Sequence, residues 1–384
     1  MSVKIVIVGA GPGGYVAAVR AAQEGAEVTI IEKDEVGGTC LNRGCIPSKV
    51  MKTTAEMLDR FQRASEFGLA VHGPVIPDIQ GLMTRKQKVV QDQVRGILKL
   101  LDHHKVRCLK GSGRIVAPDR IQVKMQGNDT EDVQWDRLIL ALGSEPMAIP
   151  GVPFDGKRII SSNEALNLTG IPDSVLIVGG GVIGCEFAFI LSSLGSQVTV
   201  VEAMERLLPL PSVDEDCSKI LQREMKKRKI RFMVNRTMES VDEKQGKLHV
   251  DIGPSPFAKD LKKKDLKPLS VDVGKVLVSV GRLPNTEDVG LEQIGVKTDQ
   301  RGWIIANDRM ETNIPSVYAI GDVLGPAKIM LAHVASAEGF VAAVNAMGGN
   351  REMDYEAVPG GIFTMPEVAD VGLTERQARE RGYN

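Results

Sequence analysis

The feature that most constrains the fold of this chain is a segment that occurs twice. The first copy, SVKIVIVGAGPGGYVAAVRAAQEGAEVTIIEK, begins at Ser2, and the second, DSVLIVGGGVIGCEFAFILSSLGSQVTVVEA, begins at Asp173. Each copy has a buried apolar strand, a glycine turn, a helix rich in alanine or leucine, and a second apolar strand. The repeat predicts an α/β protein with two Rossmann-like three-layer domains. A shift of 170 residues superimposes its key positions, namely Gly9 on Gly179, Gly11 on Gly181, Gly14 on Gly184 and Glu32 on Glu202.

The spacing inside each copy indicates what the turn binds. A lone G-x-G-x-x-G motif is weak, because a glycine-rich surface turn has the same pattern. Here the motif follows a strand, opens a helix and has an acid 18 residues after its last glycine, in both copies. The glycines allow the backbone to approach a pyrophosphate, the helix N-terminus offers free N–H groups, and the acid accepts hydrogen bonds from ribose hydroxyls. The two copies therefore predict two bound dinucleotides.

The acid of the second copy also bears on which nicotinamide dinucleotide binds. A carboxylate at Glu202 repels a 2′-phosphate, and no arginine stands directly beside it. This pattern favours NAD over NADP, although Arg206 lies four residues further on.

Composition and charge argue against several other classes of protein. The chain has 384 residues, of which 43% are hydrophobic and 25% charged, as in a globular protein of two or three domains. A formal net charge of −1 gives no reason to expect nucleic acid or an anionic membrane as a partner. No apolar run approaches the roughly 20 residues that span a bilayer. We therefore predict a cytoplasmic protein.

Outside the two copies the pattern predicts a mixture of helices and short strands. A charged amphipathic segment from about 52 to 104 predicts helices, interrupted by the turn-rich GLAVHGPVIPDI. Short strands follow, including GRIV, RIQVKM and RLILALGSEP, and a helix is expected near 215–229 with strands to about 280. IPSVYAIGDV predicts an apolar strand, KIMLAHVASAEGFVAAVNAM predicts a helix, and a new strand and helix follow from 358.

Two of the five cysteines, Cys40 and Cys45, lie five positions apart in GGTCLNRGCIPSK, near Arg43 and Lys49. The spacing is not that of a zinc site and no second pair completes four ligands, so no metal is predicted. Structural disulfides are rare in a cytosolic protein. The pair is either two buried thiols near a turn or a dithiol–disulfide couple beside the first dinucleotide, where a cation and a helix start favour the thiolate. The others, Cys108, Cys185 and Cys217, are expected as core or helix residues.

The same stretch carries a family resemblance. GGTCLNRGCIPSK resembles the active-site sequence of the flavoprotein disulfide reductases, and its Leu-Asn-Arg-Gly-Cys-Ile form is most similar to the dihydrolipoamide dehydrogenase family. The resemblance covers essentially the whole chain, because GAGPGG, the cysteine stretch, ALGSEP, IPGVPFDG, GGGVIGCE, GRLPN, AIGDV and MLAH follow the family's order. It implies an FAD-binding domain over 1–148, an NAD-binding domain over 149–275, a segment over 276–350 completing the FAD domain, and the start of an α+β interface domain over 351–384.

The resemblance also assigns roles to individual residues. Cys40 is implied to be the interchange thiol and Cys45 the thiolate against the flavin, while Lys49 pairs with Glu186 to stabilise negative charge on the reduced flavin. His333 is implied to be a helix-start residue near the flavin rather than the base. The residues implied to contact FAD are Gly9, Gly11, Gly14, Glu32, Lys33, Gly38, Thr39, Lys49, Gly113, Leu142, Gly143, Ser144, Asp322, Met330, Leu331, Ala332 and His333. Those implied to contact NAD are Gly179, Gly181, Val182, Ile183, Gly184, Glu186, Glu202 and Gly281.

The implied activity is oxidation of protein-bound dihydrolipoamide to lipoamide with reduction of NAD+ to NADH. The implied partners are the lipoyl domain of a 2-oxoacid dehydrogenase or glycine cleavage complex, and a second subunit in a homodimer. In this family a His–Glu pair in the interface domain of the partner subunit accepts the thiol protons. No histidine follows His333, so we expect this chain to lack that pair and most of the interface domain, with impaired lipoamide turnover. Two alternatives stay open, another FAD-dependent disulfide or quinone reductase and a nucleotide-binding module without turnover.

Overall fold

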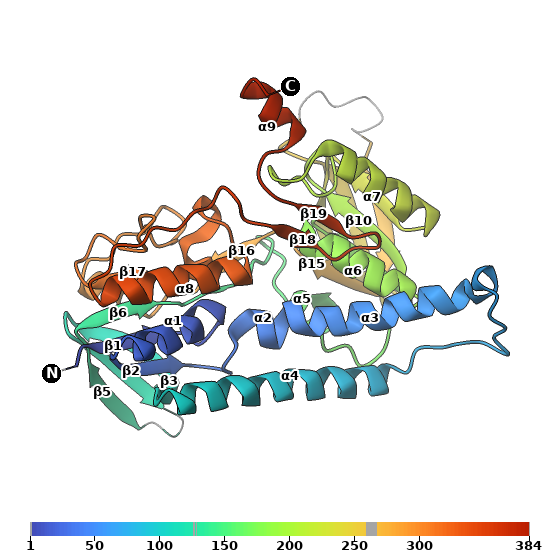
Figure 1. Cartoon of the computed structure of the whole chain (residues 1–384). Helices are drawn as coiled ribbons and strands as arrows, with labels where there is room; N and C mark the ends of the chain where they lie inside the picture. Colours follow the sequence, from blue (N-terminus) through green and yellow to red (C-terminus); the bar gives the residue numbers. More distant parts are fainter. Residues whose placement is uncertain (1, 126, 128, 259–266, 384) are drawn as a thin grey trace. The chain divides into compact units, whose positions relative to one another are not determined.

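The computed structural model describes residues 2–125, 127, 129–258 and 267–383 (Figure 1). The chain forms two compact units, each assembled from three separate stretches. Unit 1 comprises Met1–Ile46, Lys88–Glu145 and Arg282–Val358, and unit 2 comprises Pro47–Gln87, Pro146–Gly281 and Pro359–Asn384. Each unit contains one copy of the repeat. The four segments that the resemblance implies, 1–148, 149–275, 276–350 and 351–384, are divided at other positions than these compact units, and they stay predictions.

Unit 1 is built on a sheet whose strand order is β17-β6-β1-β2-β3-β4-β5. The first five strands are parallel, and β3, β4 and β5 form an antiparallel meander. β1 has the sequence KIVIV and is buried at four of its five positions, as expected for a central parallel strand covered on both faces. α1 and α8 pack against each other (Figure 1). The elements are β1 (Lys4–Val8), α1 (Pro12–Gln23), β2 (Glu27–Glu32), α2 (Gly38–Arg43), β3 (Arg107–Ala117), β4 (Arg120–Met125), β5 (Thr130–Gln134), β6 (Arg137–Leu140), β7 (Ser144–Pro146), β16 (Arg282–Pro284), η3 (Leu291–Gln293), β17 (Val317–Ala319), η4 (Gly321–Ala327) and α8 (Ala332–Ala346).

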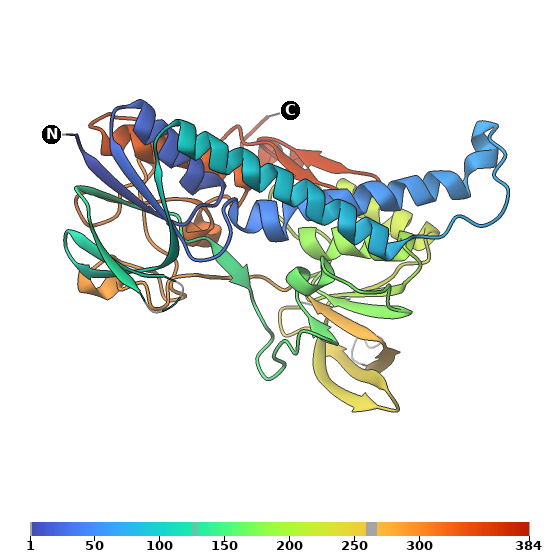
Figure 2. The same cartoon turned by 90° about the horizontal axis from the view of Figure 1, so that it is seen from below.

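Unit 2 repeats this plan with a parallel sheet of order β11-β10-β9-β15-β8. A separate antiparallel sheet, β12-β13-β14, is visible in yellow and orange in Figure 2. Val250 and Ile252 of that sheet share a buried core with Leu176 and Val178 of the parallel sheet. The elements are β8 (Ile159–Ile160), α5 (Ser162–Ala165), β9 (Ser174–Val178), α6 (Val182–Ser193), β10 (Gln197–Glu202), α7 (Glu215–Lys227), β11 (Arg231–Val234), β12 (Arg236–Lys244), β13 (Lys247–Pro254), β14 (Leu269–Val273), β15 (Lys275–Val278), β18 (Gly360–Ile362), β19 (Val368–Asp370) and α9 (Glu375–Glu380).

The charged segment after the cysteines folds as the sequence predicts. It forms α3 (Cys45–Gln62), the short η1 (Ala64–Phe67) and α4 (Ile79–His103), and the turn-rich stretch falls between η1 and α4. Within α3, buried side chains recur at helical spacing, for example at Met51, Ala55 and Leu58.

The two copies of the repeat have the same topology in three dimensions. β1 lies between β6 and β2, as β9 lies between β15 and β10. Gly9 N donates a hydrogen bond to Ile31 O at 2.7 Å, and Gly179 N donates to Val201 O at 2.8 Å. The 170-residue shift seen in the sequence therefore also relates the backbone hydrogen bonds.

Two details differ from the sequence predictions. The strand β5, TEDVQ, was not predicted, because its sequence is polar and only one of its side chains is buried. It forms an edge strand through its hydrogen bonds to β4. The helix predicted over 328–347 begins only at Ala332, because Leu331 is extended at φ −127° and ψ 145°. Within the described part of the chain, no single helix is both long and apolar enough to cross a membrane, and η4 and α8, bent by 108°, pass such a test only as a pair.

Candidate active site

The glycine turn of unit 1 is held too tightly for any side chain at two positions. Gly9 has φ +103°, and a Cβ there would lie 2.2 Å from Ala141 O. A Cβ on Gly14 would lie 1.9 Å from Gly9 O. These contacts are with backbone atoms, so α1 approaches the end of β1 only because both residues are glycine.

The turn of unit 2 has the same geometry. Gly179 has φ +104°, and a Cβ there would lie 2.4 Å from Ser279 O. A Cβ on Gly184 would lie 1.9 Å from Gly179 O. The first and last glycines of both motifs therefore serve the packing of a helix against a strand.

The middle glycine of each motif has no such reason to be a glycine. A Cβ on Gly181 would meet no described protein atom within 4 Å, and one on Gly11 would meet only Gly38 Cα at 3.9 Å. Each position opens the N-terminus of a twelve-residue helix, α1 or α6. The space that a side chain would take is thus left free beside unsatisfied backbone N–H groups, which suits the pyrophosphate of a dinucleotide.

The acid at the end of the second strand has equivalent partners in both units. Glu32 accepts hydrogen bonds from Ala10 N at 2.7 Å and Asp34 N at 2.8 Å. Glu202 is 6% exposed and accepts hydrogen bonds from backbone N–H groups at the two equivalent positions, Gly180 N at 2.6 Å and Met204 N at 2.7 Å. Each carboxylate is thereby fixed against the glycine turn, where the ribose of a dinucleotide has its hydroxyl groups.

Arg206, which could have supported a 2′-phosphate, has other partners. Its Nη2 donates hydrogen bonds to Leu210 O at 3.0 Å and to Val213 O at 2.9 Å. The loop that it holds borders a cavity of about 560 Å³ together with residues of α9. Because the guanidinium holds this loop, Glu202 is the charged group fixed at the turn, as NAD requires.

The two cysteines lie on consecutive helices directly after the first dinucleotide turn. Cys40 is in α2 and Cys45 is the first residue of α3, with Gly44 between the helices. α2 reaches the glycine turn, because a Cβ on Gly38 would lie 2.6 Å from Gly11 Cα. Burial raises the pKa of Tyr15 in α1, and the charge of Cys40 raises it further. Both observations place Cys40 beside the turn, and the position of Cys45 at a helix start favours negative charge there.

The two cations near the cysteines are both matched with acids. Arg43 forms an ion pair with Asp34, and Lys49 forms one with Glu186. The sequence predicts that these cations stabilise the thiolate form of the cysteines. Because each cation is also paired with a carboxylate, part of its positive charge is neutralised there. Lys33, which the resemblance implies at FAD, is exposed, and Thr39 is half-buried in α2.

A hydrogen-bonded network joins three segments of unit 1 near the predicted FAD contacts. Ser144 Oγ donates to Asp322 Oδ2 at 2.7 Å. Arg282 donates through Nε to Ser144 Oγ and through Nη2 to Ser144 O, both at 2.6 Å. Asn285 donates from Nδ2 to Leu142 O at 2.9 Å and from its backbone N to Gly143 O at 3.2 Å.

Arg282 and Asn285 were not among the predicted site residues. Both belong to the GRLPN stretch, whose order in the chain supported the resemblance but whose side chains had no assigned role. Burial lowers the pKa of Arg282, and the charge of Asp322 opposes this effect. Through these contacts within the protein, the network fixes Asp322 and the 142–144 backbone.

The Lys49–Glu186 pair is present within unit 2. Lys49 Nζ lies 3.1 Å from each carboxylate oxygen of Glu186, whose side chain is 9% exposed. Phe363, a residue without a predicted role, donates its backbone N–H to Glu186 Oε1 at 3.0 Å. The Lys49 ammonium lies 4.2 Å from the centroid of the Phe363 ring.

The remaining predicted residues occupy several environments. Gly113 packs against side chains, and a Cβ there would lie 3.0 Å from Ile121 Cδ1, so a larger residue would have to displace that side chain slightly. Gly281 has φ +147°, which favours glycine, and accepts a hydrogen bond from Met147 N at 3.0 Å. His333 is exposed in the first turn of α8, after the half-buried Met330, Leu331 and Ala332, and Val182 and Ile183 are half-buried at the start of α6.

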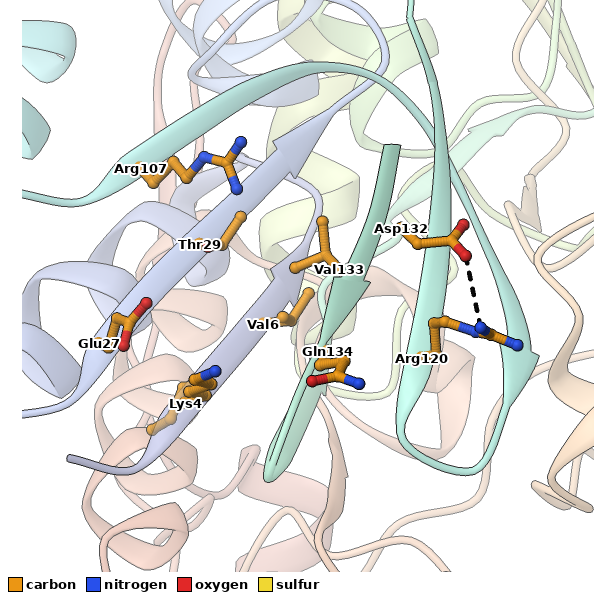
Figure 3. Close-up of a pocket in the computed structure, with 10 residues that line it drawn as sticks. Lys4, Val6, Glu27, Thr29, Arg107, Arg120, Asp132, Val133 and Gln134 are labelled. Carbon is orange, nitrogen blue, oxygen red and sulfur yellow. Dashed lines mark ion pairs between the residues drawn. The ribbon is translucent and has the colours of Figure 1, made fainter. Parts of the chain in front are cut away.

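A cavity of about 350 Å³ lies elsewhere in unit 1 (Figure 3). Lys4, Glu27 and Arg107, which line it, are the first residues of β1, β2 and β3. Arg120 and Asp132, also in its wall, form an ion pair at 3.5 Å (Figure 3). Ligands of parallel sheets bind at the carboxyl ends of the strands, so this cavity at the amino ends is separate from the glycine turn.

The fold and site define a class of protein. The chain belongs to the pyridine nucleotide-disulphide oxidoreductase family, whose profile matches residues 3–339. It is a flavoprotein oxidoreductase that uses FAD and NAD. The dinucleotide sites fit these cofactors, because each has a free space at its middle glycine and a fixed acid at the end of its second strand.

Within this class the similarity is to dihydrolipoyl dehydrogenases. The chain is 42% identical over 379 residues to that of Chlamydia muridarum, covering 98% of this chain and 77% of that protein. It is 38% identical over 376 residues to that of Bacillus subtilis, covering 98% and 78%. It is 39% identical over 383 residues to dihydrolipoyl dehydrogenase 1, mitochondrial, of Arabidopsis thaliana, covering 99% and 73%.

Solved structures show the same fold. LpdA from Mycobacterium tuberculosis has a TM-score of 0.89 at 27% identity, covering 99% of this chain and 80% of that chain. The flavoprotein disulfide reductase RclA from Escherichia coli has a TM-score of 0.82 at 24% identity and supports the fold alone. The predicted α/β fold, the resemblance and both cofactors are therefore confirmed, while the individual site residues stay predictions.

Proposed function

We propose that this chain oxidises protein-bound dihydrolipoamide to lipoamide and reduces NAD+ to NADH, with Cys40 and Cys45 as its redox pair. The observation that carries this proposal is the contact of α2 with the first glycine turn, where Gly38 lies against Gly11. Cys40 and Cys45 follow Gly38 closely in the chain. In this proposal they form a dithiol–disulfide couple beside the dinucleotide of unit 1. The names of the relatives supply the substrate class.

The thiol chemistry uses the cysteine pair as a disulfide at the start of each turnover. One thiolate of dihydrolipoamide attacks Cys40 Sγ, and the bond to Cys45 breaks with its electron pair left on Cys45. The second substrate thiolate then attacks the substrate's own sulfur in this mixed disulfide, and the bond to Cys40 breaks with its electron pair left on Cys40 Sγ. Lipoamide leaves with a new disulfide, two protons are released, and both cysteines are reduced. Bound FAD would supply the two-electron chemistry that links this dithiol to NAD+.

The other residues hold charge and position. Lys49, paired with Glu186, supplies a positive charge to stabilise the reduced flavin. The Arg282–Ser144–Asp322 network fixes the carboxylate that would contact the FAD chain. Glu32 and Glu202, which backbone N–H groups fix at the glycine turns, would hold the ribose groups of FAD and NAD. The partners in this proposal are a lipoyl domain of a 2-oxoacid dehydrogenase or glycine cleavage complex and a second subunit, and a cytoplasmic location stays a prediction.

An anaerobic titration of the flavin-containing protein with dihydrolipoamide, followed by visible absorbance, tests the proposal. We expect a long-wavelength band after two electrons, because a thiolate in contact with the oxidised flavin absorbs there. NADH should then form when NAD+ is added. Bleaching of the flavin by NADH with no response to dihydrolipoamide would contradict the proposal and favour another disulfide or quinone as substrate.

A further inference from the structure

The C-terminal part of unit 2 makes a contact with the Lys49–Glu186 pair that the proposed function does not use. Phe363 follows β18 and opens the connection to β19. Its backbone N–H donates to Glu186 Oε1 at 3.0 Å, while Lys49 Nζ lies 3.1 Å from the same oxygen. One carboxylate oxygen therefore receives a hydrogen bond from Phe363 and one from Lys49.

The ring of Phe363 adds a second interaction. The Lys49 ammonium lies 4.2 Å from its centroid, within the range of about 6 Å over which a cation is attracted to an aromatic face. The ring attracts the ammonium without carrying a formal negative charge. Lys49 is thus held between a carboxylate and a neutral ring, and less of its charge is cancelled than between two acids.

Core packing does not account for an aromatic residue at this position. Phe363 is 37% exposed, whereas its neighbours Ile362 and Thr364 are 3% and 0% exposed. The neighbours anchor the backbone, so the ring stands out of the core toward α3. A leucine would serve a half-exposed packing role as well, but it could not attract an ammonium.

The connection is attached to α3 at a second point that does not depend on Phe363. Lys52 is 6% exposed and forms ion pairs with Glu56, at 2.9 Å, and with Glu367 from the same connection. Burial lowers the pKa of Lys52, but hydrogen bonds to Glu367 and Glu56 outweigh this effect and raise the pKa overall. Loss of the Phe363 ring should therefore leave the connection in place.

We propose that Phe363 is a positioning residue that fixes the charged end of Lys49, through its ring on the ammonium and its backbone N–H on Glu186. The inference rests on the proposed function for the role of Lys49 at the flavin. The ring and the backbone N–H together hold the ammonium and the carboxylate in fixed positions, so the C-terminal part of unit 2 helps to fix the charge that the proposed function assigns to Lys49.

Competitive acetylation of lysines in the flavin-containing full chain, read by mass spectrometry at mildly alkaline pH, tests the contact directly. Phe363→Leu should speed acetylation of Lys49 by roughly two- to thirtyfold relative to Lys86, because the side chain loses the contact that holds it against the ring and meets the reagent more readily. Phe363→Tyr keeps an aromatic face and should restore the slow rate. Phe232→Leu is the matched control, since Lys226 lies 5.5 Å from that ring in the same unit, and it should leave Lys49 unchanged.

The flavin midpoint potential provides the second measurement. Phe363→Leu should make the potential more negative, while Phe363→Tyr and Phe232→Leu should leave it at the wild-type value. An unchanged acetylation rate of Lys49 in Phe363→Leu, an equal rise at Lys49 and Lys86, or a tyrosine variant that behaves like the leucine variant would each overturn the positioning role.

The acetylation result is independent of the substrate. If the dihydrolipoamide titration fails and the Lys49 rates behave as expected, the proposed function is wrong and the contact stands. If the titration succeeds and the rates do not change, the function stands and the role of Phe363 is wrong.

Discussion

Two glycines of the second motif, Gly184 and Gly181, serve different purposes, so alanine substitutions there should have opposite effects on stability and on NADH binding. In Gly184→Ala the new methyl would lie 1.9 Å from Gly179 O, whereas real Cβ contacts essentially never fall below 3.0 Å. The helix must therefore move by about 1 Å from the strand, and overpacking of this kind costs about 1–3 kcal/mol. We expect the upper half of that range, because the contacted atom belongs to the backbone.

Gly181→Ala should behave in the opposite way. Its methyl would meet no described protein atom within 4 Å and the backbone there needs no positive φ, so the free energy of unfolding should change by less than about 0.5 kcal/mol. The methyl would instead enter the space proposed for the pyrophosphate. We expect the dissociation constant for NADH to rise by about tenfold or more, which corresponds to about 1.4 kcal/mol.

Denaturant unfolding and calorimetric titration with NADH separate these effects. Gly170→Ala is the control, since its methyl would also meet no atom of the described residues within 4 Å and its φ is not positive. It should change neither quantity. Normal NADH binding by Gly181→Ala would refute the assignment of the free space to the pyrophosphate. Wild-type stability of Gly184→Ala would refute the packing argument.

Three further predictions concern unit 1. Cys45→Ser should abolish the long-wavelength band on two-electron reduction, whereas Cys40→Ser should show such a band before any reductant is added; loss of the band in both variants would exclude Cys45 as the thiolate at the flavin. Arg282→Met should weaken FAD binding by about tenfold or more by freeing Asp322, as measured by the FAD retained on dialysis, and full retention would contradict the network. Burial raises the pKa of Glu338, so the native chain keeps a proton that the unfolded chain releases, and the free energy of unfolding should fall as pH rises from the ordinary carboxyl value of about 4.3 to the raised pKa. Glu338→Gln should flatten that dependence in denaturant unfolding, and an unchanged slope would show that another group causes it.

The parts of the fold that could be predicted from the sequence are those that short stretches determine. The apolar run of β1, the turn at Gly9 and the helix after it follow one another within a few residues, and the positive φ of Gly9 and the close contact of Gly14 with Gly9 O both arise inside this short stretch. The same holds in the second copy. The long helices after the cysteines have a clear amphipathic pattern, and the break between them is rich in turn residues.

The supporting contacts of the site could not be predicted, because they join residues far apart in the chain. Arg282 and Ser144 are 138 residues apart, and Phe363 and Glu186 are 177 residues apart. No periodicity links such positions. β5 was missed for a related reason, since its polar sequence becomes a strand only through its hydrogen bonds to β4.

The hydrogen bonds that fix Glu202 have a consequence for changing the cofactor preference. Its carboxylate occupies the backbone N–H groups of Gly180 and Met204. Replacement by an uncharged, shorter side chain would remove the repulsion of a 2′-phosphate and would also release two donors that point at the same place. A single substitution at Glu202 would thus replace a group that repels the 2′-phosphate with two N–H donors that can bind it. An engineer who seeks NADP specificity would need to add a cation nearby rather than rebuild the turn.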